Sequence, residues 1–515
     1  MILRAPALGF IIVLFIILAV VAARFSFSLP ENSGSESTAL PPSEKGWLAQ
    51  SVAEMVGEHP DLTGIAPLRD GAEAFAARML LADSAAASID AEYYIWRADL
   101  TGYLLLDQLK KAADRGVRVR LLLDDHGVAG LDPEIAQLSA HPNAEVRLWN
   151  PFTLRSFKMM GYTFDFFRLN RRMHNKSFTV DGRESVLGGR NVGDEYFGTG
   201  KTPLFVDLDV LVVGKIVPAI SEDFDRYWNS PSAYPAELIV ADADGSDPIA
   251  AGLNRFKDTE QIKEYREVLR HSDLVARLAA GTFDLEWTTA LLVSDDPGKG
   301  QGAIPDEDLL GGRLLKAVGK IEGRLDGVSA YFVPGAQGVN AFTALEDEGV
   351  EVRILTNSLE ATDVLPVHAG YSKRREGLLK GGVELFELRR QAPAIEEKKI
   401  LGPFGSSGAS LHAKTFAVDG KRIFVGSFNF DPRSARINTE LGLLIDSEHL
   451  AGALHRAFDE GFGGSAWQVK KREGKLVWIE PAAPSVPPLT AEPGANLWRR
   501  AAITFIGWLP VEWLL

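Results

Sequence analysis

A short polar motif occurs twice in this 515-residue chain, and it constrains the fold more than any other feature of the sequence. The pattern is His-x-Lys-x4-Asp-x6-Gly-x2-Asn, and its copies begin at His174 and His412, 238 residues apart. Eight of the eighteen positions in 174–191 are identical in 412–429. One copy could arise by chance, but two matching copies indicate an internal duplication.

A second pair of segments repeats at nearly the same distance. "RGVRVRLLLDD" at 115–125 corresponds to "EGVEVRILTNS" at 348–358, 233 residues later. In each half a strand pattern, a helix pattern and another strand pattern follow one another with short links, which predicts parallel β-α-β units and an α/β fold. A repeat distance above 200 residues predicts two similar domains rather than a solenoid. The expected elements are strand 88–96, helix 102–116 and strand 117–125, then strand 327–335, helix 340–349 and strand 350–358.

Composition and repeats together divide the chain into five segments. These are a membrane anchor or signal segment (1–28), a linker (29–51), a first domain (52–275), a second domain (276–480), and a Pro-rich linker with an aromatic, membrane-associated tail (481–515).

The first segment contains nineteen uncharged residues, from Ala5 to Ala23. A helix of that length extends about 28 Å, close to the thickness of the hydrocarbon core of a bilayer. Arg4 before the run favours a cytoplasmic N-terminus with the body on the other side, although Arg24 follows it. The alternative is a cleaved signal peptide, because "VVAA" offers small residues at a possible cleavage site.

The tail also has a composition that suits a membrane interface. Residues 496–515 include Trp498, Trp508 and Trp513, with Arg499 and Arg500 near the start. Aromatic rings beside basic and aliphatic residues are typical of the interfacial region of a bilayer. The alternative is a terminal segment that packs on the core of the protein itself.

Charge and cysteine content exclude several classes of function. The formal net charge of −14 argues against a nonspecific nucleic-acid-binding protein, which needs a broad positive field. The chain has no cysteine, so disulfides and thiolate metal sites are excluded.

Each copy of the motif is expected to form a β-hairpin. Asp181-Gly182 and Asp419-Gly420 stand between strand-like runs, a strong signal for a tight turn. Residues two apart on a strand share a face, so each histidine projects beside the lysine that follows it. The return strand brings the asparagine of each copy back toward the same end.

A face that carries histidine, lysine and asparagine suits an anionic phosphodiester. Lys176 and Lys414 offer positive charge to phosphate oxygens, and Asn191 and Asn429 offer neutral hydrogen-bond donors. A neutral histidine can attack phosphorus, and a second, protonated histidine can protonate the leaving oxygen. One site needs both, and two domains that meet across a pseudo-twofold axis would supply both.

The paired motif resembles the signature of the phospholipase D superfamily, and the resemblance covers residues 60–515. It implies a bilobal α/β fold with one active site between the lobes, no metal, no cofactor and a phosphohistidine intermediate. His174 would be the nucleophile and His412 the general acid, with the reverse left open by the sequence. Asp181 and Asp419 would complete the catalytic motifs, or act only as turn formers that shape the site.

Two glutamates stand where members of the superfamily keep a carboxylate that orients a catalytic histidine. These are Glu195 in "NVGDEYF" and Glu440 in "NTELGLLID". A hydrogen bond from imidazole to carboxylate would fix the tautomer and stabilise the charged ring. The alternative for each is an exposed charge at the end of a helix or strand.

Several longer stretches resemble the bacterial C-type cardiolipin synthases: "FDFFRLNRRMHNKSFTVDG", "TDVLPVHAGY", "SFNFDPRSARINTELGLLI" and "LPVEWLL". The resemblance implies a phosphatidyltransferase that moves a phosphatidyl unit from phosphatidylethanolamine onto phosphatidylglycerol and releases ethanolamine. Its partners would be these phospholipids and the membrane, with no nucleic acid. The expected location is the bacterial inner membrane, with a single N-terminal anchor and the body on the periplasmic side.

Other functions are compatible with parts of the sequence. A phospholipase D hydrolase would use the same residues and differ only in taking water as the acceptor. A nuclease of the superfamily is disfavoured by the acidic charge, and a non-catalytic binding protein by the two complete motifs. Arg168, Arg171 and Arg172 either attract lipid phosphates or form a solvated basic cluster. His126 and His368 are interpreted as loop or strand-end histidines outside the catalytic set.

Overall fold

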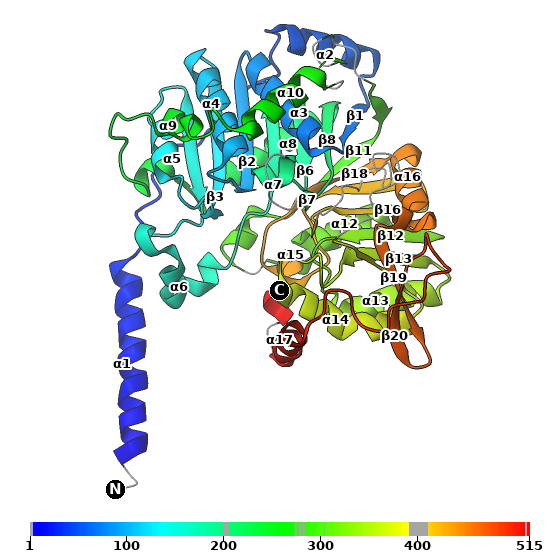
Figure 1. Ribbon diagram of the computed structural model, residues 1–515. Helices are drawn as coiled ribbons and strands as arrows, with labels where there is room; N and C mark the ends of the chain where they lie inside the picture. The colour runs from blue at the N-terminus through cyan, green and yellow to red at the C-terminus, as the bar shows by residue number, and fades with distance from the viewer. Residues whose placement is uncertain are drawn as a thin grey trace.

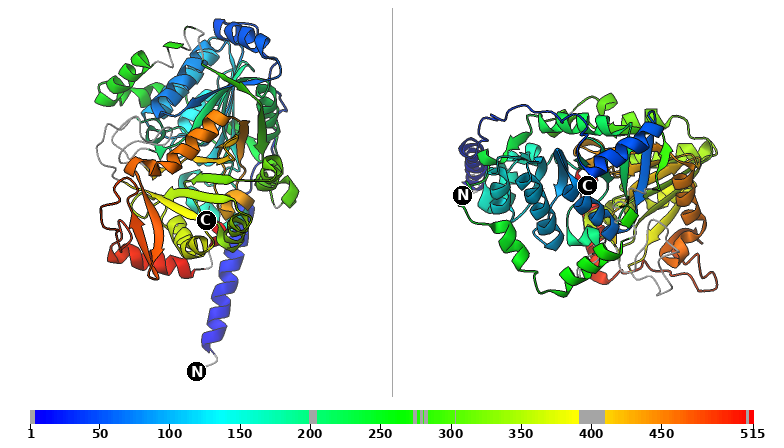
Figure 2. Two further views of the ribbon diagram at one scale, coloured as in Figure 1. Left: turned by 90° about the vertical axis from the view of Figure 1, so that its right-hand side faces the viewer. Right: turned by 90° about the horizontal axis from the view of Figure 1, so that it is seen from above.

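The computed structural model describes residues 4–198, 205–272, 276–277, 280, 284–302, 304–390, 410–509 and 512–515. Two lobes lie against one another, each built on a mixed sheet with helices packed on it (Figures 1 and 2). The first lobe runs from blue to green in Figure 1, and the second from green to red. The predicted α/β class with two similar lobes is confirmed.

Each described sheet has nine strands, and the two sheets share one arrangement. The order in the first lobe is β10 (Glu286–Thr288), β1 (Thr63–Leu68), β8 (Asp209–Gly214), β6 (Glu184–Gly188), β5 (Lys176–Val180), β2 (Ser88–Ile95), β3 (Arg118–Gly127), β4 (Ala144–Trp149) and β9 (Ala233–Pro235). The order in the second lobe is β11 (Ala290–Ser294), β18 (Leu441–Asp446), β17 (Arg422–Gly426), β16 (Lys414–Val418), β12 (Arg324–Ser329), β13 (Glu351–Asn357), β14 (Glu384–Leu388), β19 (Ala466–Arg472) and β20 (Lys475–Ile479). The run β8-β6-β5-β2-β3-β4 thus corresponds to β18-β17-β16-β12-β13-β14.

Parallel strands form the middle of each sheet, because helices connect them. β2, β3 and β4 are parallel, as are β12, β13 and β14. The side chain of Asp99 accepts a hydrogen bond from the backbone N–H of Gly102 (3.0 Å) and so caps the helix between β2 and β3. The predicted strand, helix, strand order is confirmed in both halves. The principal helices are α3 (Gly71–Ser84), α4 (Leu100–Asp114), α5 (Asp132–Ser139) and α8 (Val217–Trp228), then α12 (Leu310–Val318), α13 (Gly335–Asp347), α14 (Leu365–Lys380) and α16 (Glu448–Asp459).

Both copies of the motif form the predicted hairpins. β5 pairs antiparallel with β6, and β16 pairs antiparallel with β17. Asp181 and Gly182 have φ of 53° and 64°, and Asp419 and Gly420 have φ of 54° and 66°. Two consecutive positive φ values are what a type I′ hairpin turn requires, which explains the Asp-Gly pair.

Apolar packing joins the two lobes. Leu187, Val210 and Val212 of the first sheet belong to the same buried cluster as Val425 and Leu443 of the second. Each such side chain stabilises the contact by about 1.5–3 kcal/mol relative to exposure. The chain passes from the first sheet to the second between β10 and β11, whereas the predicted boundary at 275 lies outside the described residues.

The N-terminal helix α1 (Arg4–Ser26) projects away from both lobes (Figures 1 and 2). At its base, Phe27 stacks on Phe164 of α6 (Tyr162–Leu169), with ring centroids 5.6 Å apart. Within the ranges given above, no helix combines the length and the apolar composition that crossing a membrane requires.

The segment predicted as a linker lies along the first lobe. The guanidinium of Arg147 donates a hydrogen bond to the carbonyl oxygen of Ser35 (2.5 Å), and the N–H of Ala39 donates to Asp225 (2.8 Å). These contacts attach the segment after α1 to the body of the protein.

The C-terminal tail has one packed face and one exposed face. Helix α17 (Leu497–Trp508) packs on α14, and Arg499 donates a hydrogen bond to the carbonyl oxygen of Leu359 (3.1 Å). Trp498 and Trp508 nevertheless expose 83% and 81% of their surface. The tail therefore packs on the second lobe, as the alternative interpretation held, and also presents aromatic rings outward.

Candidate active site

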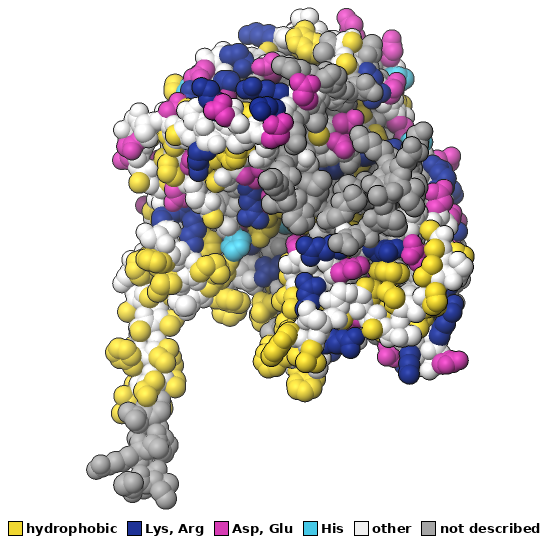
Figure 3. Space-filling view, in the orientation of Figure 1, with side chains coloured by type: hydrophobic (Ala, Val, Ile, Leu, Met, Phe, Trp, Pro, Cys, Tyr) yellow, Lys and Arg dark blue, Asp and Glu magenta, His cyan; other side chains and the backbone are white. Residues whose placement is uncertain are grey.

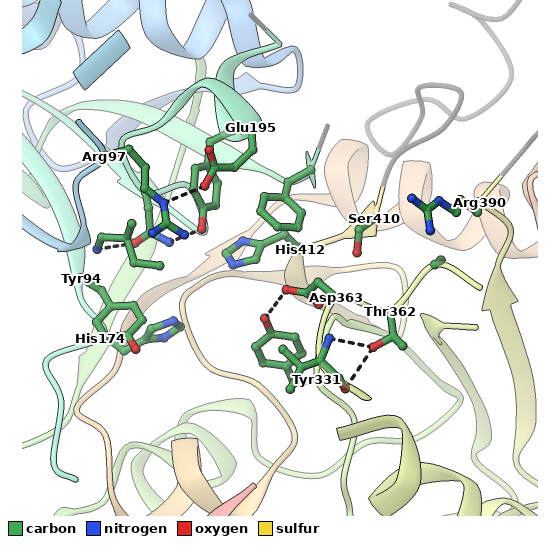
Figure 4. Close-up of a pocket in the computed structure, with 16 residues that line it drawn as sticks. Tyr94, Arg97, His174, Glu195, Tyr331, Thr362, Asp363, Arg390, Ser410 and His412 are labelled. Carbon is green, nitrogen blue, oxygen red and sulfur yellow. Dashed lines mark hydrogen bonds and ion pairs between the residues drawn. The ribbon is translucent and has the colours of Figure 1, made fainter. Parts of the chain in front are cut away.

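The two motif histidines line one cavity of about 690 Å³ between the lobes (Figure 4). Both lobes contribute to its wall, the first through Tyr94 and Tyr196 and the second through Tyr331. The structure therefore brings the two copies of the motif together, as the pseudo-twofold arrangement requires.

His174 is held in place by the opposite lobe. Its backbone N–H donates to the carbonyl oxygen of Thr439 (2.9 Å), and the N–H of Thr439 donates to the carbonyl oxygen of Arg172 (3.0 Å). This bridge places the next residue, Glu440, beside the imidazole, with Nδ1 of His174 2.8 Å from Oε2. The hydroxyl of Ser434 donates to the other oxygen, Oε1, at 2.6 Å.

His412 is held by the first lobe in the corresponding way. The short parallel pair β7 (Phe205–Val206) and β15 (Ser410–Leu411) joins the lobes, and the N–H of His412 donates to the carbonyl oxygen of Val206 (2.8 Å). Asp207 follows, and its Oδ2 lies 2.5 Å from Nδ1 of His412. Each histidine therefore receives its carboxylate from the other lobe.

The two motif lysines are buried beneath the histidines. The ammonium of Lys176 donates to the carbonyl oxygen of His174 (2.5 Å), and that of Lys414 donates to the carbonyl oxygen of His412. Nζ of Lys414 also lies 3.1 Å from Nε2 of His412. Burial lowers the pKa of both lysines, yet the surrounding carboxylates oppose that effect.

The electrostatic environments of the two histidines differ. Burial, followed by the charges of Lys176 and Lys414, holds the pKa of His174 well below its usual value. Burial and Lys414 lower the pKa of His412 to about 4, while the adjacent Asp207 acts in the opposite direction. Burial raises the pKa of Glu440 to about 7. Burial acts likewise on Asp207, but Lys414 and His412 outweigh it, so the pKa of this carboxyl lies below its usual value.

A family model described as "Cardiolipin synthase, PLD-like domain" matches residues 80–228 and again 314–461, once in each lobe. The chain belongs to this family. It is 45% identical to cardiolipin synthase C of Escherichia coli over 474 residues, which cover 91% of this chain and 99% of that one. An uncharacterized protein of Helicobacter pylori strain 26695 is 31% identical over 83% of this chain and 84% of its own.

A solved structure supports the fold of this phospholipase D-like family member. The phosphatidylserine synthase of Haemophilus influenzae superposes with a TM-score of 0.54 over 90% of this chain and all of that one, at 15% identity. The predicted membership of the phospholipase D superfamily is confirmed, and the protein is an enzyme of that family.

One of the two glutamates predicted to orient a histidine occupies a different position. Glu440 lies on His174, but Glu195 forms an ion pair with Arg97 (3.0 Å) at the wall of the cavity. The carboxylate on His412 is that of Asp207. Glu195 lies on α7 (Asp194–Phe197), ahead of the strand pair that carries the inter-lobe contact, and so cannot follow that pair as Asp207 does.

A sequence signal for Asp207 existed in the second repeat distance. Asp207 precedes Glu440 by 233 residues, the distance that separates 115–125 from 348–358. "VDLDVLV" and "TELGLLI" then align, with both carboxylates at the start of an equivalent strand, β8 or β18.

The two motif aspartates lie at the far ends of their hairpins from the cavity. Asp181 accepts hydrogen bonds from the N–H groups of Ala86, Ala87 and Ser88, at 2.7–2.9 Å for the closest oxygen to each. Asp419 does the same for residues 322–324. The intervening five-residue strand extends about 16 Å. Assigning these aspartates to catalysis is therefore wrong: they fix the loops before β2 and β12.

The two motif asparagines are buried behind the histidines. Oδ1 of Asn191 accepts from the N–H of Ile95 (3.1 Å), and Oδ1 of Asn429 accepts from the N–H of Tyr331 (3.4 Å). Asn191 also lines the cavity, and its amide donates to the hydroxyl of Tyr196 (3.0 Å). Both asparagines support the ends of neighbouring strands, and their contact with phosphate stays a prediction.

The basic cluster before the first motif is occupied by internal partners. Arg168 bonds to Asp165 (2.6 Å), Arg171 donates to the carbonyl oxygen of Lys299 (3.1 Å), and Arg172 pairs with Asp124 (3.0 Å). These contacts favour a structural use of the cluster over attraction of lipid phosphates.

The two histidines left outside the catalytic set differ in position. His368 is buried on α14 and lies 2.8 Å from Glu492 of the tail segment. His126 lies near the site, with Nδ1 3.1 Å from the hydroxyl of Tyr162. Its ring is stacked at 6.4 Å from Tyr94, which in turn contacts His174 edge-on at 5.0 Å.

Proposed function

We propose that this protein synthesises cardiolipin by transferring a phosphatidyl group from phosphatidylethanolamine to phosphatidylglycerol through a phosphohistidine. The observation that carries the proposal is the pair of histidine–carboxylate contacts at one cavity, His174 with Glu440 and His412 with Asp207. Nδ1–H bonded to a carboxylate leaves Nε2 of each ring available for reaction. The Escherichia coli relative is a cardiolipin synthase by name.

In the first step, Nε2 of His174 attacks phosphorus and the bond from phosphorus to the headgroup oxygen breaks. His412 gives its Nε2 proton to that oxygen, and ethanolamine leaves. In the second step, the hydroxyl of phosphatidylglycerol attacks phosphorus and passes its proton to His412. The phosphorus–nitrogen bond breaks, which frees His174 and yields cardiolipin.

Charge supports this assignment of the two histidines. The pKa of His174 lies well below its usual value because of burial and the two lysines, so its ring is neutral and nucleophilic. The carboxyl of Asp207 keeps a low pKa, so its negative charge stabilises an imidazolium at His412. A bound phosphate adds further negative charge and raises the affinity of His412 for a proton.

A phospholipase D hydrolase is the second candidate, with water in place of phosphatidylglycerol. Water at about 55 M competes at every turnover unless the cavity raises the effective concentration of the lipid alcohol. Aromatic side chains at the wall, such as Tyr94, Phe205 and Tyr331, favour lipid over water there.

We further propose that the bacterial inner membrane is the site of action, with α1 as the anchor and the body on the periplasmic side. Figure 3 shows hydrophobic side chains along α1 and over α6 and α17 at the lower edge of the molecule. Large exposed apolar side chains there include Phe10, Phe15, Phe157, Met159, Phe167, Trp498, Phe505 and Trp508. Such contiguous exposure is typical of a membrane contact.

The deciding experiment uses the purified full chain in vesicles of phosphatidylethanolamine, phosphatidylglycerol, or both. Lipids and free headgroups are quantified by mass spectrometry, with H174A as the blank. Cardiolipin with an equal amount of ethanolamine, formed only in the mixture, is the expected result. Cardiolipin with glycerol from phosphatidylglycerol alone would overturn the donor, and phosphatidic acid as the main product would favour the hydrolase.

A further inference from the structure

The His412 side of the cavity carries a carboxylate that the proposed chemistry does not use. Asp363 lies between β13 and α14, and it lines the cavity together with His412. The hydroxyl of Tyr331 donates to Oδ2 of Asp363 at 2.8 Å, which orients the carboxylate. Within the described parts of the chain, Oδ1 has no hydrogen-bond partner and remains available to a ligand.

Aromatic rings surround this side of the site. The ring centroids of Tyr196, Phe205 and Tyr331 lie 5.1, 5.0 and 6.5 Å from that of His412. Aromatic faces attract cations, and a carboxylate among them adds direct charge pairing. The wall around His412 therefore has the chemistry of an ammonium site.

The other charges at the cavity do not match this description. Glu195 is paired with Arg97 at 3.0 Å, and in Figure 4 that pair lies above His412 whereas Asp363 lies below it. Arg390, also at the wall, donates to the carbonyl oxygen of Glu360 at 3.5 Å. The field of Asp363 reaches the reacting groups, because its charge acts to raise the pKa of Lys414.

We propose that Asp363, with the surrounding rings, binds the ammonium group of the donor headgroup and thereby selects a phospholipid with a cationic headgroup. This inference rests on the proposed function, in which His412 protonates the departing headgroup oxygen. The ammonium of ethanolamine stands two carbons beyond that oxygen, on the His412 side. Asp363 is then a specificity-determining residue that holds the leaving group, and it exchanges no proton.

The test compares two donors in one protein. Wild type and D363N, as purified full chains, are assayed for ethanolamine release from mixed vesicles and for glycerol release from phosphatidylglycerol vesicles. We expect D363N to lower ethanolamine release by about 10- to 100-fold, as for loss of a hydrogen bond between charged groups, and glycerol release by less than about threefold. D363E, which keeps the charge, should recover part of the preference.

The matched control is D306N, the same change at an exposed aspartate that pairs with Arg436 away from the cavity. A variant that loses both activities by one factor, or keeps its ethanolamine release, would overturn the proposal, because neither result is a change of donor preference. If wild type itself releases only glycerol, the donor in the proposed function fails and this inference fails with it. A wild type that releases ethanolamine while D363N keeps its preference for that donor would sink only the present inference.

A second measurement uses free headgroups as inhibitors. Ethanolamine should inhibit glycerol release by wild type through the ammonium site, and D363N should require at least about tenfold more of it. Inhibition by free glycerol should be the same in both proteins. Equal sensitivity of wild type and D363N to ethanolamine would contradict the assignment.

Discussion

Nδ1 of His174 lies 2.8 Å from Oε2 of Glu440, a residue 266 positions further along the chain and in the other lobe. The same relation holds in reverse between His412 and Asp207. Neither lobe contains a complete histidine–carboxylate pair. The active site therefore exists only when the two lobes are docked, and the shared apolar cluster between the sheets makes that docking part of the fold.

The first prediction separates the nucleophile from the acid. A phosphatidyl ester of p-nitrophenol needs no proton on its leaving oxygen, so H412N should release one nitrophenolate per enzyme molecule in a burst and then stall. H174N should show no burst, because it lacks the nitrogen that attacks phosphorus. Stopped-flow absorbance checks this result. A burst in H174N and none in H412N would reverse the two assignments.

The second prediction concerns the carboxylate that the sequence missed. D207N should lower kcat by about 10²- to 10⁴-fold, because the amide cannot stabilise an imidazolium at His412. E195Q should lower kcat by less than about tenfold, since Glu195 bonds to Arg97 and not to the ring. Steady-state rates in mixed vesicles check both. A greater loss in E195Q than in D207N would restore Glu195 as the orienting residue.

The third prediction is a pH dependence. The carboxyl of Glu440 must be ionised to accept the Nδ1 proton of His174, and its pKa is raised to about 7 by burial. Activity should therefore fall as the pH drops below about 7, because the protonated carboxyl no longer orients the ring. In E440Q the maximum should be lower and this limb absent. Profiles of kcat/KM from pH 5 to 9 check the shape, and an unchanged limb in E440Q would assign it to another group.

The fourth prediction tests the structural use of the motif aspartates. D181A removes the charged acceptor of three backbone N–H groups, so the free energy of unfolding should fall by about 3 kcal/mol. The folded fraction should keep kcat within about threefold, because Asp181 lies at the opposite end of β5 from the cavity. Denaturant unfolding and rates at low temperature check the two parts, with D61A at an exposed aspartate as control. Lost catalysis at unchanged stability would return Asp181 to the catalytic set.

The fifth prediction concerns the membrane surface. The double variant W498A/W508A should float less with anionic vesicles, because each tryptophan exposes more than 80% of its surface on α17. W47A on α2 (Trp47–Glu58), at the opposite end of the first lobe in Figure 1, is the matched control and should float as wild type. Equal flotation of all three proteins would leave α17 without a lipid contact.

Much of the site could be predicted because it is local. A hairpin with an Asp-Gly turn places residues two apart on one face, so the motif fixed the relation of each histidine to the lysine after it. The duplicated motif also implied that two histidines share one site, since one lobe has only one of the groups that the chemistry needs. Lys176 and Lys414 lie beneath their histidines as that periodicity requires.

The sequence by itself therefore determined the α/β class, the duplication and the identity of the reacting side chains, all of which depend on neighbours within a hairpin or a β-α-β unit. The tertiary structure decided which carboxylate meets which histidine. That choice depends on the register in which Met173 pairs with Thr439 and Leu411 with Val206, across the lobe interface. No period along the chain encodes such a register, because it is set by apolar packing between two sheets that are remote in sequence.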